Sequence, residues 1–99
     1  MKAHELLSDE SKWCQKTFAV DAHGVSIHCD NPRAVAWCLD GALLRCYLDA
    51  RASDRAAYRQ VANAIRAGGP GTLGGVSAWN DAPGRTYAEV YALLKRLDI

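Results

Sequence analysis

The helical character of the chain is clearest in the stretch Asn31-Pro-Arg-Ala-Val-Ala-Trp-Cys-Leu-Asp-Gly-Ala-Leu-Leu-Arg-Cys-Tyr-Leu-Asp49. It opens with a residue type that caps helices, followed by proline at the first helical position, where its missing N–H is not needed. We therefore predict a helix from Asn31 to about Asp49, in which Gly41 admits a close helix neighbour. The apolar residues that recur at spacings of three and four predict its core-facing stripe: Val35, Cys38, Leu39, Ala42, Leu43 and Cys46.

The segment before this helix predicts one more helix and a small β-hairpin. Met1 to Cys14 is expected to be helical, with an interruption between Ser8 and Ser11, and its core-facing residues are Ala3, Leu6, Leu7 and Trp13. Two short β-prone runs, Thr17 to Val20 and Val25 to Ile27, flank a turn that contains glycine. This pattern is typical of a hairpin, and an isolated hairpin needs support from the helices.

The segment after it predicts two further helices. Ser53 or Asp54 caps a helix that ends near Ala67, with Tyr58, Val61, Ala62 and Ile65 facing inward. A glycine-rich loop follows from Gly68 to Gly75, and the last helix opens with the capping box Thr86-x-x-Glu89 and buries Val90, Leu93, Leu94 and Leu97. The expected fold is mainly α, about four helices around one core with a minor β-hairpin, in a single domain over residues 1–99.

Composition narrows the classes of function. The 99 residues are 49% hydrophobic and 23% charged, with a net charge of +1, which indicates a folded chain with no strong overall field toward nucleic acid or an anionic membrane. No run of about 18 apolar residues is present, so we expect a cytoplasmic protein without a membrane anchor. The cysteines have no C-x-x-C spacing and are expected to be free thiols: Cys14, Cys29, Cys38 and Cys46.

The densest group of polar and turn-forming residues is Ala78-Trp-Asn-Asp-Ala-Pro-Gly-Arg-Thr86. One interpretation is purely structural: Asn80 and Asp81 bond to nearby backbone, and Trp79 fills the core ahead of the last helix. The other is a binding lip, in which Trp79 is an apolar anchor and the polar residues supply directional contacts. An arginine stripe at four-residue spacing would extend it, and the candidate binding residues are Trp79, Asn80, Asp81, Arg85, Arg51, Arg55 and Arg59.

Parts of the sequence also resemble a known family, and this resemblance implies no mechanism. The segments Ala36-Trp-Cys-Leu-Asp-Gly-Ala-Leu-Leu-Arg45 and Trp79-Asn-Asp-Ala-Pro-Gly-Arg-Thr86, followed by Glu89-Val-Tyr-Ala-Leu-Leu94, resemble an uncharacterised bacterial and phage domain family. The resemblance runs from about Trp13 to Leu97. It implies a compact helical domain in a phage or prophage setting, where small proteins often inhibit host defence complexes. Our first hypothesis is therefore a non-catalytic protein-binding function, with an inhibitor of a CRISPR-type complex as its particular form.

The sequence leaves three alternatives to protein binding: a cysteine-dependent enzyme, a metal site and a nucleic-acid binder. Cys38 or Cys29 with a histidine and Asn80 or Asp81 would make a small cysteine-dependent enzyme, but a thiol on an apolar stripe is usually inert. His23, His28, Cys29 and Asp30 are clustered, yet their spacing matches no zinc pattern, so no metal or other cofactor is predicted.

Nucleic-acid binding is the weakest alternative. Three phosphate contacts from the arginine stripe would give only weak binding, so we favour an acidic protein surface as the partner. Trp37, Leu44, Tyr47 and Leu48 lie off the core stripe of the second helix, so we expect this helix to be central in the fold. The excess apolar surface also allows a homodimer.

Overall fold

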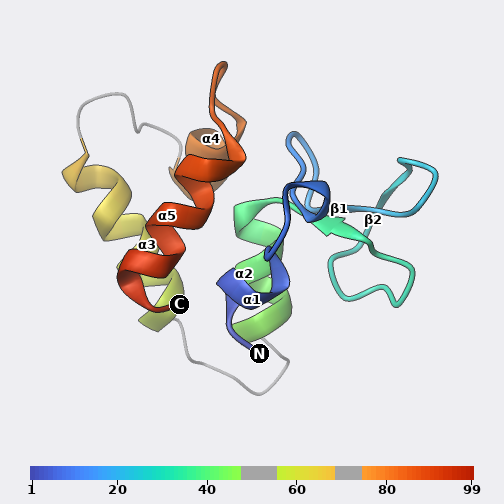
Figure 1. Ribbon diagram of the computed structural model, residues 1–99, viewed down its shortest axis with the longest axis horizontal. Helices are drawn as coiled ribbons and strands as arrows, with labels where there is room; N and C mark the ends of the chain where they lie inside the picture. Colours follow the sequence, from blue (N-terminus) through green and yellow to red (C-terminus); the bar gives the residue numbers. More distant parts are fainter. Residues whose placement is uncertain (48–55, 69–74) are drawn as a thin grey trace.

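The computed structural model describes residues 1–47, 56–68 and 75–99. Within these ranges the chain is mainly helical with a small sheet, as the sequence predicts (Figure 1). The elements in chain order are α1 Ala3–Leu6, the 3-10 helix η1 Glu10–Lys12, β1 Ala19–Val20, β2 Ser26–Ile27, β3 Ala36–Trp37, α2 Leu39–Tyr47, α3 Ala56–Ala67, α4 Gly75–Asp81 and α5 Tyr87–Leu97.

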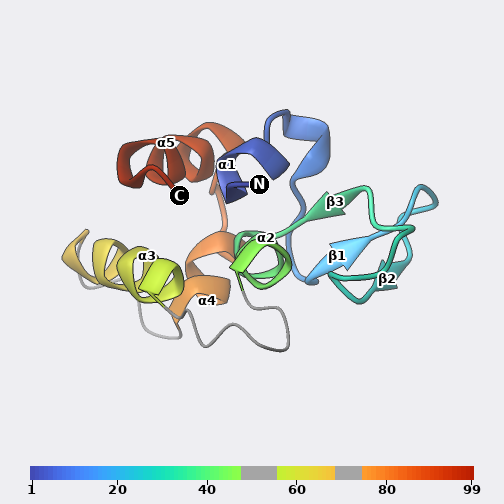
Figure 2. The ribbon, with the colours of Figure 1, turned by 90° about the horizontal axis from the view of Figure 1, so that it is seen from below.

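The sheet is antiparallel, with β1 between β2 and β3 (Figure 2). Ala19 of β1 lies opposite Ile27 of β2 on one side and opposite Trp37 of β3 on the other. The predicted hairpin is therefore confirmed, and β3 is an addition that the sequence analysis placed inside a helix. Because Ala19 is fully buried and Trp37 is 9% exposed, one face of this sheet packs on the core.

The predicted first helix is much shorter than expected. α1 ends at Leu6, and the expected interruption is real: Asp9 caps η1 by accepting a hydrogen bond from the Ser11 N–H at 3.2 Å. The chain then becomes extended, and Trp13 forms a parallel bridge with Trp37. Ala3 and Leu7 are fully buried, as predicted, whereas Trp13 is half-buried beside the sheet.

The predicted start of the second helix at Asn31-Pro32 is wrong, because α2 begins at Leu39. Asn31 instead accepts a hydrogen bond from the Arg33 N–H at 2.9 Å and closes a turn, and Val35 then donates to the Val20 carbonyl. Pairing with β1 therefore replaces the expected first helical turns. Val35 is 46% exposed rather than in the core stripe. The remaining part of that stripe is correct, since three of its residues are fully buried: Leu39, Ala42 and Leu43.

Gly41 admits a close neighbour, but this neighbour is a strand segment and not a helix. A Cβ at Gly41 would lie 2.0 Å from the Phe18 carbonyl oxygen. The same carbonyl accepts a hydrogen bond from the Cys38 N–H at 3.2 Å. The first turn of α2 is thus seated on the backbone that leads into β1, which positions the helices against the sheet.

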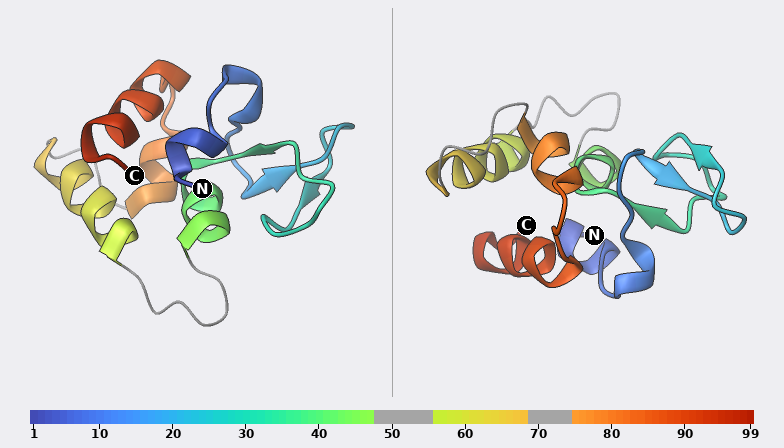
Figure 3. Two further views of the ribbon diagram at one scale, coloured as in Figure 1. Left: turned by 60° about the horizontal axis from the view of Figure 1, so that its bottom comes forward. Right: turned by 90° about the horizontal axis from the view of Figure 1, so that it is seen from above.

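The helices form the larger part of the molecule, and the sheet lies at one end (Figures 1 and 3). α4 contacts both α2 and α3, and α5 contacts α1 and α3. Their shared core includes four fully or almost fully buried residues, Val61, Val76, Val90 and Leu94. The two termini lie close together (Figure 3), where the His4 N–H donates to the Ile99 carbonyl at 3.0 Å. None of the described helices is long and apolar enough to span a lipid bilayer.

Several predicted boundaries lie outside the described residues: the end of the second helix at Asp49, the caps Ser53 and Asp54, and most of the loop from Gly68 to Gly75. α3 ends at Ala67, as predicted, and buries Val61 and Ile65. α5 follows the N-cap Thr86, as predicted.

Candidate functional site

The segment Ala78 to Thr86 begins as a helix, which the structural interpretation, with local backbone bonds from Asn80 and Asp81, did not include. α4 extends to Asp81, so Trp79, Asn80 and Asp81 are helical and point in different directions around one short helix. The turn is confined to the next residues, where Gly84 has a φ of +82° and the Arg85 N–H donates to the Ala82 carbonyl at 3.0 Å. The candidate residues are therefore divided among three environments.

Trp79 and Arg85 form one unit. The Arg85 guanidinium carbon lies 3.8 Å from the centre of the Trp79 ring, a cation–π arrangement. Arg85 Nε also donates to the Trp79 carbonyl at 2.9 Å, and its Nη1 bonds to Glu89 Oε2 at 2.9 Å. The Arg85 side chain is only 18% exposed. These contacts hold both side chains in one conformation, so Trp79 offers a rigid, half-buried apolar surface.

A hollow of about 330 Å³ lies beside Trp79, and we call it the α3–α5 groove. Apolar residues line most of it, while Glu89 and Arg96 supply its charges. The groove draws on the helices α3, α4 and α5, and its lining residues are Ala64, Ile65, Gly68, Trp79, Glu89, Ala92, Leu93 and Arg96. Sequence reasoning found only Trp79 as a binding residue here. The others carry no local signal, because tertiary packing creates the groove.

Asn80 belongs to the interior and is fully buried. Its Oδ1 accepts hydrogen bonds from Trp13 Nε1 at 2.7 Å and from the Leu39 N–H at 3.0 Å. Its Nδ2 donates to the Cys14 carbonyl at 3.2 Å and to Asp81 Oδ1 at 2.9 Å. Every polar atom of this side chain is used within the chain, so Asn80 has none left for a partner in this conformation.

Asp81 faces a second hollow, of about 350 Å³, together with Lys16, Cys38 and Ser77. Its Oδ1 accepts a hydrogen bond from the Lys16 N–H at 2.8 Å. Lys16 has a φ of +69°, a conformation that side-chain-bearing residues rarely adopt, and the bond from Asp81 helps to hold it there. Asp81 therefore orients the chain before β1 and is separate from the pair of Trp79 and Arg85.

The predicted arginine stripe is described only at Arg59, because Arg51 and Arg55 fall in the range 48–55 that the structure leaves out. Arg59 is exposed on α3. Arg66 is exposed on the same helix, and Arg96 lies across the groove on α5. Arg59, Arg66 and Arg96 thus lie on the two helices that border the α3–α5 groove.

The thiols are poorly suited to nucleophilic catalysis. Burial raises the pKa of Cys38 to about 11, and the Cys38 Sγ accepts a hydrogen bond from the Gly41 N–H at 3.2 Å. Burial also raises the pKa of Cys14 to about 12 and the pKa of Cys29 above its ordinary value. All four cysteines are free. Because the thiolate is the reactive form, such thiols react slowly at neutral pH.

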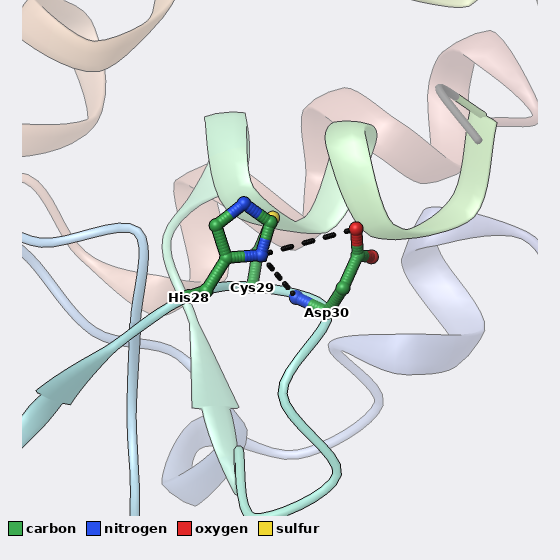
Figure 4. A group of neighbouring side chains, drawn as sticks. All are labelled: His28, Cys29 and Asp30. Carbon is green, nitrogen blue, oxygen red and sulfur yellow. Dashed lines mark hydrogen bonds and ion pairs between the residues drawn. The ribbon is translucent and has the colours of Figure 1, made fainter. Parts of the chain in front are cut away.

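His28, Cys29 and Asp30 converge at the turn after β2 (Figure 4). One candidate donor atom from each of the three residues lies within 4.8 Å of the others. Cys29 is 3% exposed, whereas His28 and Asp30 are exposed. His23, which the sequence analysis grouped with them, is not part of this cluster in the structure.

The comparisons with known proteins identify a family and assign no activity. No curated protein and no solved structure matches the chain significantly. A family model covers almost its whole length, which confirms the expectation of an uncharacterised family. The chain belongs to the Family of unknown function (DUF6197), whose model matches residues 1–97.

Proposed function

We propose that the chain binds a partner protein through the α3–α5 groove and performs no chemistry of its own. The observation that carries this proposal is Trp79, which lines the groove and is held by the Arg85 guanidinium stacked on its ring. Tryptophan and arginine are the residue types that dominate the binding energy of protein interfaces. Here their side chains are held before any partner arrives, so little conformational entropy is lost on binding.

The charges around the groove favour a partner segment with apolar side chains flanked by acidic ones. The lining carboxylate, Glu89, is already engaged with Arg85 and with the Thr86 N–H at 3.0 Å. Arg96 lines the groove, and Arg59 and Arg66 are exposed on the neighbouring helix. Guanidinium groups bind carboxylates in a planar, two-point geometry. An amphipathic acidic segment fits both the apolar floor and this cationic border.

The test uses one blocking substitution and one matched control. Ala92 is exposed and lines the groove, so Ala92→Glu fills it with a bulky side chain whose charge repels an acidic partner. Ala88 is exposed on the same helix but outside the groove, which makes Ala88→Glu the control. Tagged wild type and both variants are used to capture partners from a bacterial lysate, followed by mass spectrometry. We expect one defined partner with wild type and Ala88→Glu, and its loss with Ala92→Glu.

Trp79→Ala provides a second test of the same surface. It removes the apolar anchor and releases Arg85, so we expect capture to fall at least about tenfold, the scale of a binding hot spot. Circular dichroism must show that this variant keeps its helices. Equal recovery of the partner by wild type, Ala92→Glu and Trp79→Ala contradicts the site. If Ala92→Glu instead dissociates a homodimer, the occupant is a second copy of the chain.

Within this proposal, the particular role is inhibition of a bacterial defence complex, such as a CRISPR effector, by a cytoplasmic phage or prophage protein. The resemblance noted in the sequence supports this role by analogy alone. Its own test is separate: a purified effector complex is assayed with and without the wild-type chain. Unchanged effector activity at saturating protein overturns the inhibitor role. The groove proposal is tested separately, by the capture experiment.

A further inference from the structure

A second site lies outside the groove, at the turn that connects β2 with β3. His28, Cys29 and Asp30 are consecutive, yet their side chains gather on one side of this turn (Figure 4). The His28 Nδ1 lies 4.0 Å from the Cys29 Sγ and 3.9 Å from the Asp30 Oδ2. Among the parts of the chain that the structure describes, this is the group of histidine, cysteine and acidic side chains that meets the spacing of a metal site.

Two of the hydrogen bonds that hold the turn do not involve the three donor atoms. The Asn31 N–H donates to the His28 carbonyl at 3.0 Å and closes the turn. Trp37 Nε1 donates to the Cys29 carbonyl at 2.9 Å, which anchors the turn to β3 through a buried hydrogen bond. These hydrogen bonds therefore fix the backbone that carries the three donor side chains against the core of the protein.

The His28 ring is oriented for ligation through Nδ1. The Asp30 N–H donates to His28 Nδ1 at 3.1 Å, so this nitrogen carries a lone pair in the arrangement observed. A neutral imidazole nitrogen with a free lone pair is the form that binds metal ions. The Asp30 backbone lies in an exposed turn, where water can replace this hydrogen bond when a cation takes the lone pair.

The donor set and its dimensions fit one class of cation. Thiolate, imidazole and carboxylate are the ligands of Zn²⁺, with bonds of about 2.0 to 2.3 Å. In a tetrahedron such bonds place the donor atoms about 3.3 to 3.6 Å apart. The two separations from His28 Nδ1, 3.9 Å to Asp30 and 4.0 Å to Cys29, exceed these values by about half an ångström, and the Cys29 and Asp30 donor atoms lie within 4.8 Å of each other. Rotation of the exposed His28 and Asp30 side chains supplies the movement that brings the three donors together.

We propose that His28, Cys29 and Asp30 bind Zn²⁺ or another borderline divalent cation. The Cys29 thiol loses its proton to solvent as the metal–sulfur bond forms, and a water molecule completes the coordination. Such a site cross-links the exposed His28 and Asp30 side chains to the buried Cys29 sulfur. This cross-link stabilises the connection between β2 and β3. It is independent of the α3–α5 groove, so failure of either proposal leaves the other intact.

The test uses Co²⁺, whose bond to a thiolate gives a near-ultraviolet absorption band, and titration calorimetry with Zn²⁺. We expect one equivalent of each ion to bind the wild-type chain and the cobalt–thiolate band to appear. Cys29→Ser should abolish the band. His28→Gln and Asp30→Asn change exposed side chains, so both variants should fold normally. We expect each to weaken Zn²⁺ binding at least about tenfold, because mutating even the residues that hydrogen-bond to metal ligands lowers metal affinity by about 10- to 100-fold.

Two matched variants serve as controls. His23→Gln removes an exposed histidine outside the cluster, and Cys46→Ser removes a half-buried thiol outside the cluster, so neither should alter the band or the affinity. Absence of a cobalt–thiolate band in the wild type up to about 1 mM Co²⁺ overturns the proposal. Persistence of the band in Cys29→Ser, or unchanged Zn²⁺ affinity in both His28→Gln and Asp30→Asn, overturns it equally.

Discussion

Asn80 connects three segments that are distant in the sequence. Its amide binds the Trp13 side chain, the first backbone N–H of α2 at Leu39, and the Cys14 carbonyl. These groups lie in or next to the core, and within the described residues no buried side-chain nitrogen or oxygen lacks a partner. Satisfied buried polar groups define a unique arrangement, whereas an unsatisfied one costs about 1 to 3 kcal/mol. Asn80 is therefore a structural residue, although it stands in the most conspicuous polar motif of the sequence.

Replacing Asn80 with alanine is expected to lower the free energy of unfolding by about 3 kcal/mol, because it leaves the partners of the lost amide without hydrogen bonds. The measurement is urea denaturation followed by circular dichroism. Asn63→Ala is the control, since Asn63 is exposed on α3, and a change within about 0.5 kcal/mol is expected there. Equal effects of the two substitutions would show that the buried amide is not needed.

Gly41→Ala tests the contact between α2 and the segment before β1. Helix propensity alone predicts that alanine stabilises a helix by about 1 kcal/mol relative to glycine. A Cβ at Gly41 would, however, meet the Phe18 carbonyl oxygen at 2.0 Å, and backbone cannot move aside as a side chain does. We expect the opposite sign, a loss of about 3 kcal/mol or more in the free energy of unfolding. A stabilised Gly41→Ala variant would contradict the packing described here.

At the scale of elements, the start of α5 is held by a reciprocal pair. The Thr86 hydroxyl accepts a hydrogen bond from the Glu89 N–H at 3.3 Å, and the Glu89 carboxylate accepts one from the Thr86 N–H at 3.0 Å. Thr86→Ala should therefore lower the free energy of unfolding by about 1 kcal/mol. The hydrogen bonds from the Thr86 backbone and side chain, aided by Arg85, lower the pKa of Glu89 below its ordinary value of 4.5.

This lowered pKa makes the contribution of Glu89 depend on pH. The carboxylate is favoured in the folded chain, so its stabilising effect is complete above pH 4.5 and is lost as the pH falls through the lowered folded value. We expect Glu89→Gln to be less stable than wild type at neutral pH and the two to converge in acid. Urea midpoints of both proteins across this range provide the measurement. A difference in stability between the two proteins that stays constant with pH would show that the charge of Glu89 does not stabilise the start of α5.

The elements also show where sequence reasoning succeeds. The start of α5 is predicted correctly because its signal, Thr86 with Glu89, is local and complete. The start of α2 is not, because Asn31 and Pro32 have the chemistry of a helix start but pairing of β3 with β1 prevails. That pairing joins residues far apart in the sequence, and no local pattern encodes it. α4 was missed because its residue types are typical of turns.

The candidate site follows the same rule. Trp79 and Arg85 are close in sequence, so their motif could be recognised, and the structure places the guanidinium over the ring. The apolar wall that faces them comes from Ala64 and Leu93, on helices before and after that motif. In the sequence, nothing distinguishes these two residues from other apolar positions of a helix. The groove therefore emerges only when α3, α4 and α5 are packed together.

At the scale of the whole molecule, the two ends of the described chain are joined. His4 Nδ1 lies 2.9 Å from the Ile99 carbonyl oxygen, and Lys2 forms an ion pair with Asp98 at 2.7 Å. Both ionic partners are largely exposed, so this pair adds little stability. Ile99 is different, because its side chain is only 5% exposed and belongs to the shared core of α1 and α5. The apolar contact, and not the ion pair, should connect the ends.

Ile99→Ala is therefore expected to lower the free energy of unfolding by about 2 kcal/mol, the lower end for removing a buried isoleucine, since a site just beyond the end of α5 can partly collapse. The loss should appear as one cooperative transition in both tryptophan fluorescence and circular dichroism, because the core that Ile99 joins includes residues from α1 to α5. Val35→Ala is the control, as Val35 is 46% exposed and should change stability by no more than about 0.5 kcal/mol. Loss of α1 contacts alone, with the fluorescence transition unchanged, would instead mean that the termini form a separately melting unit.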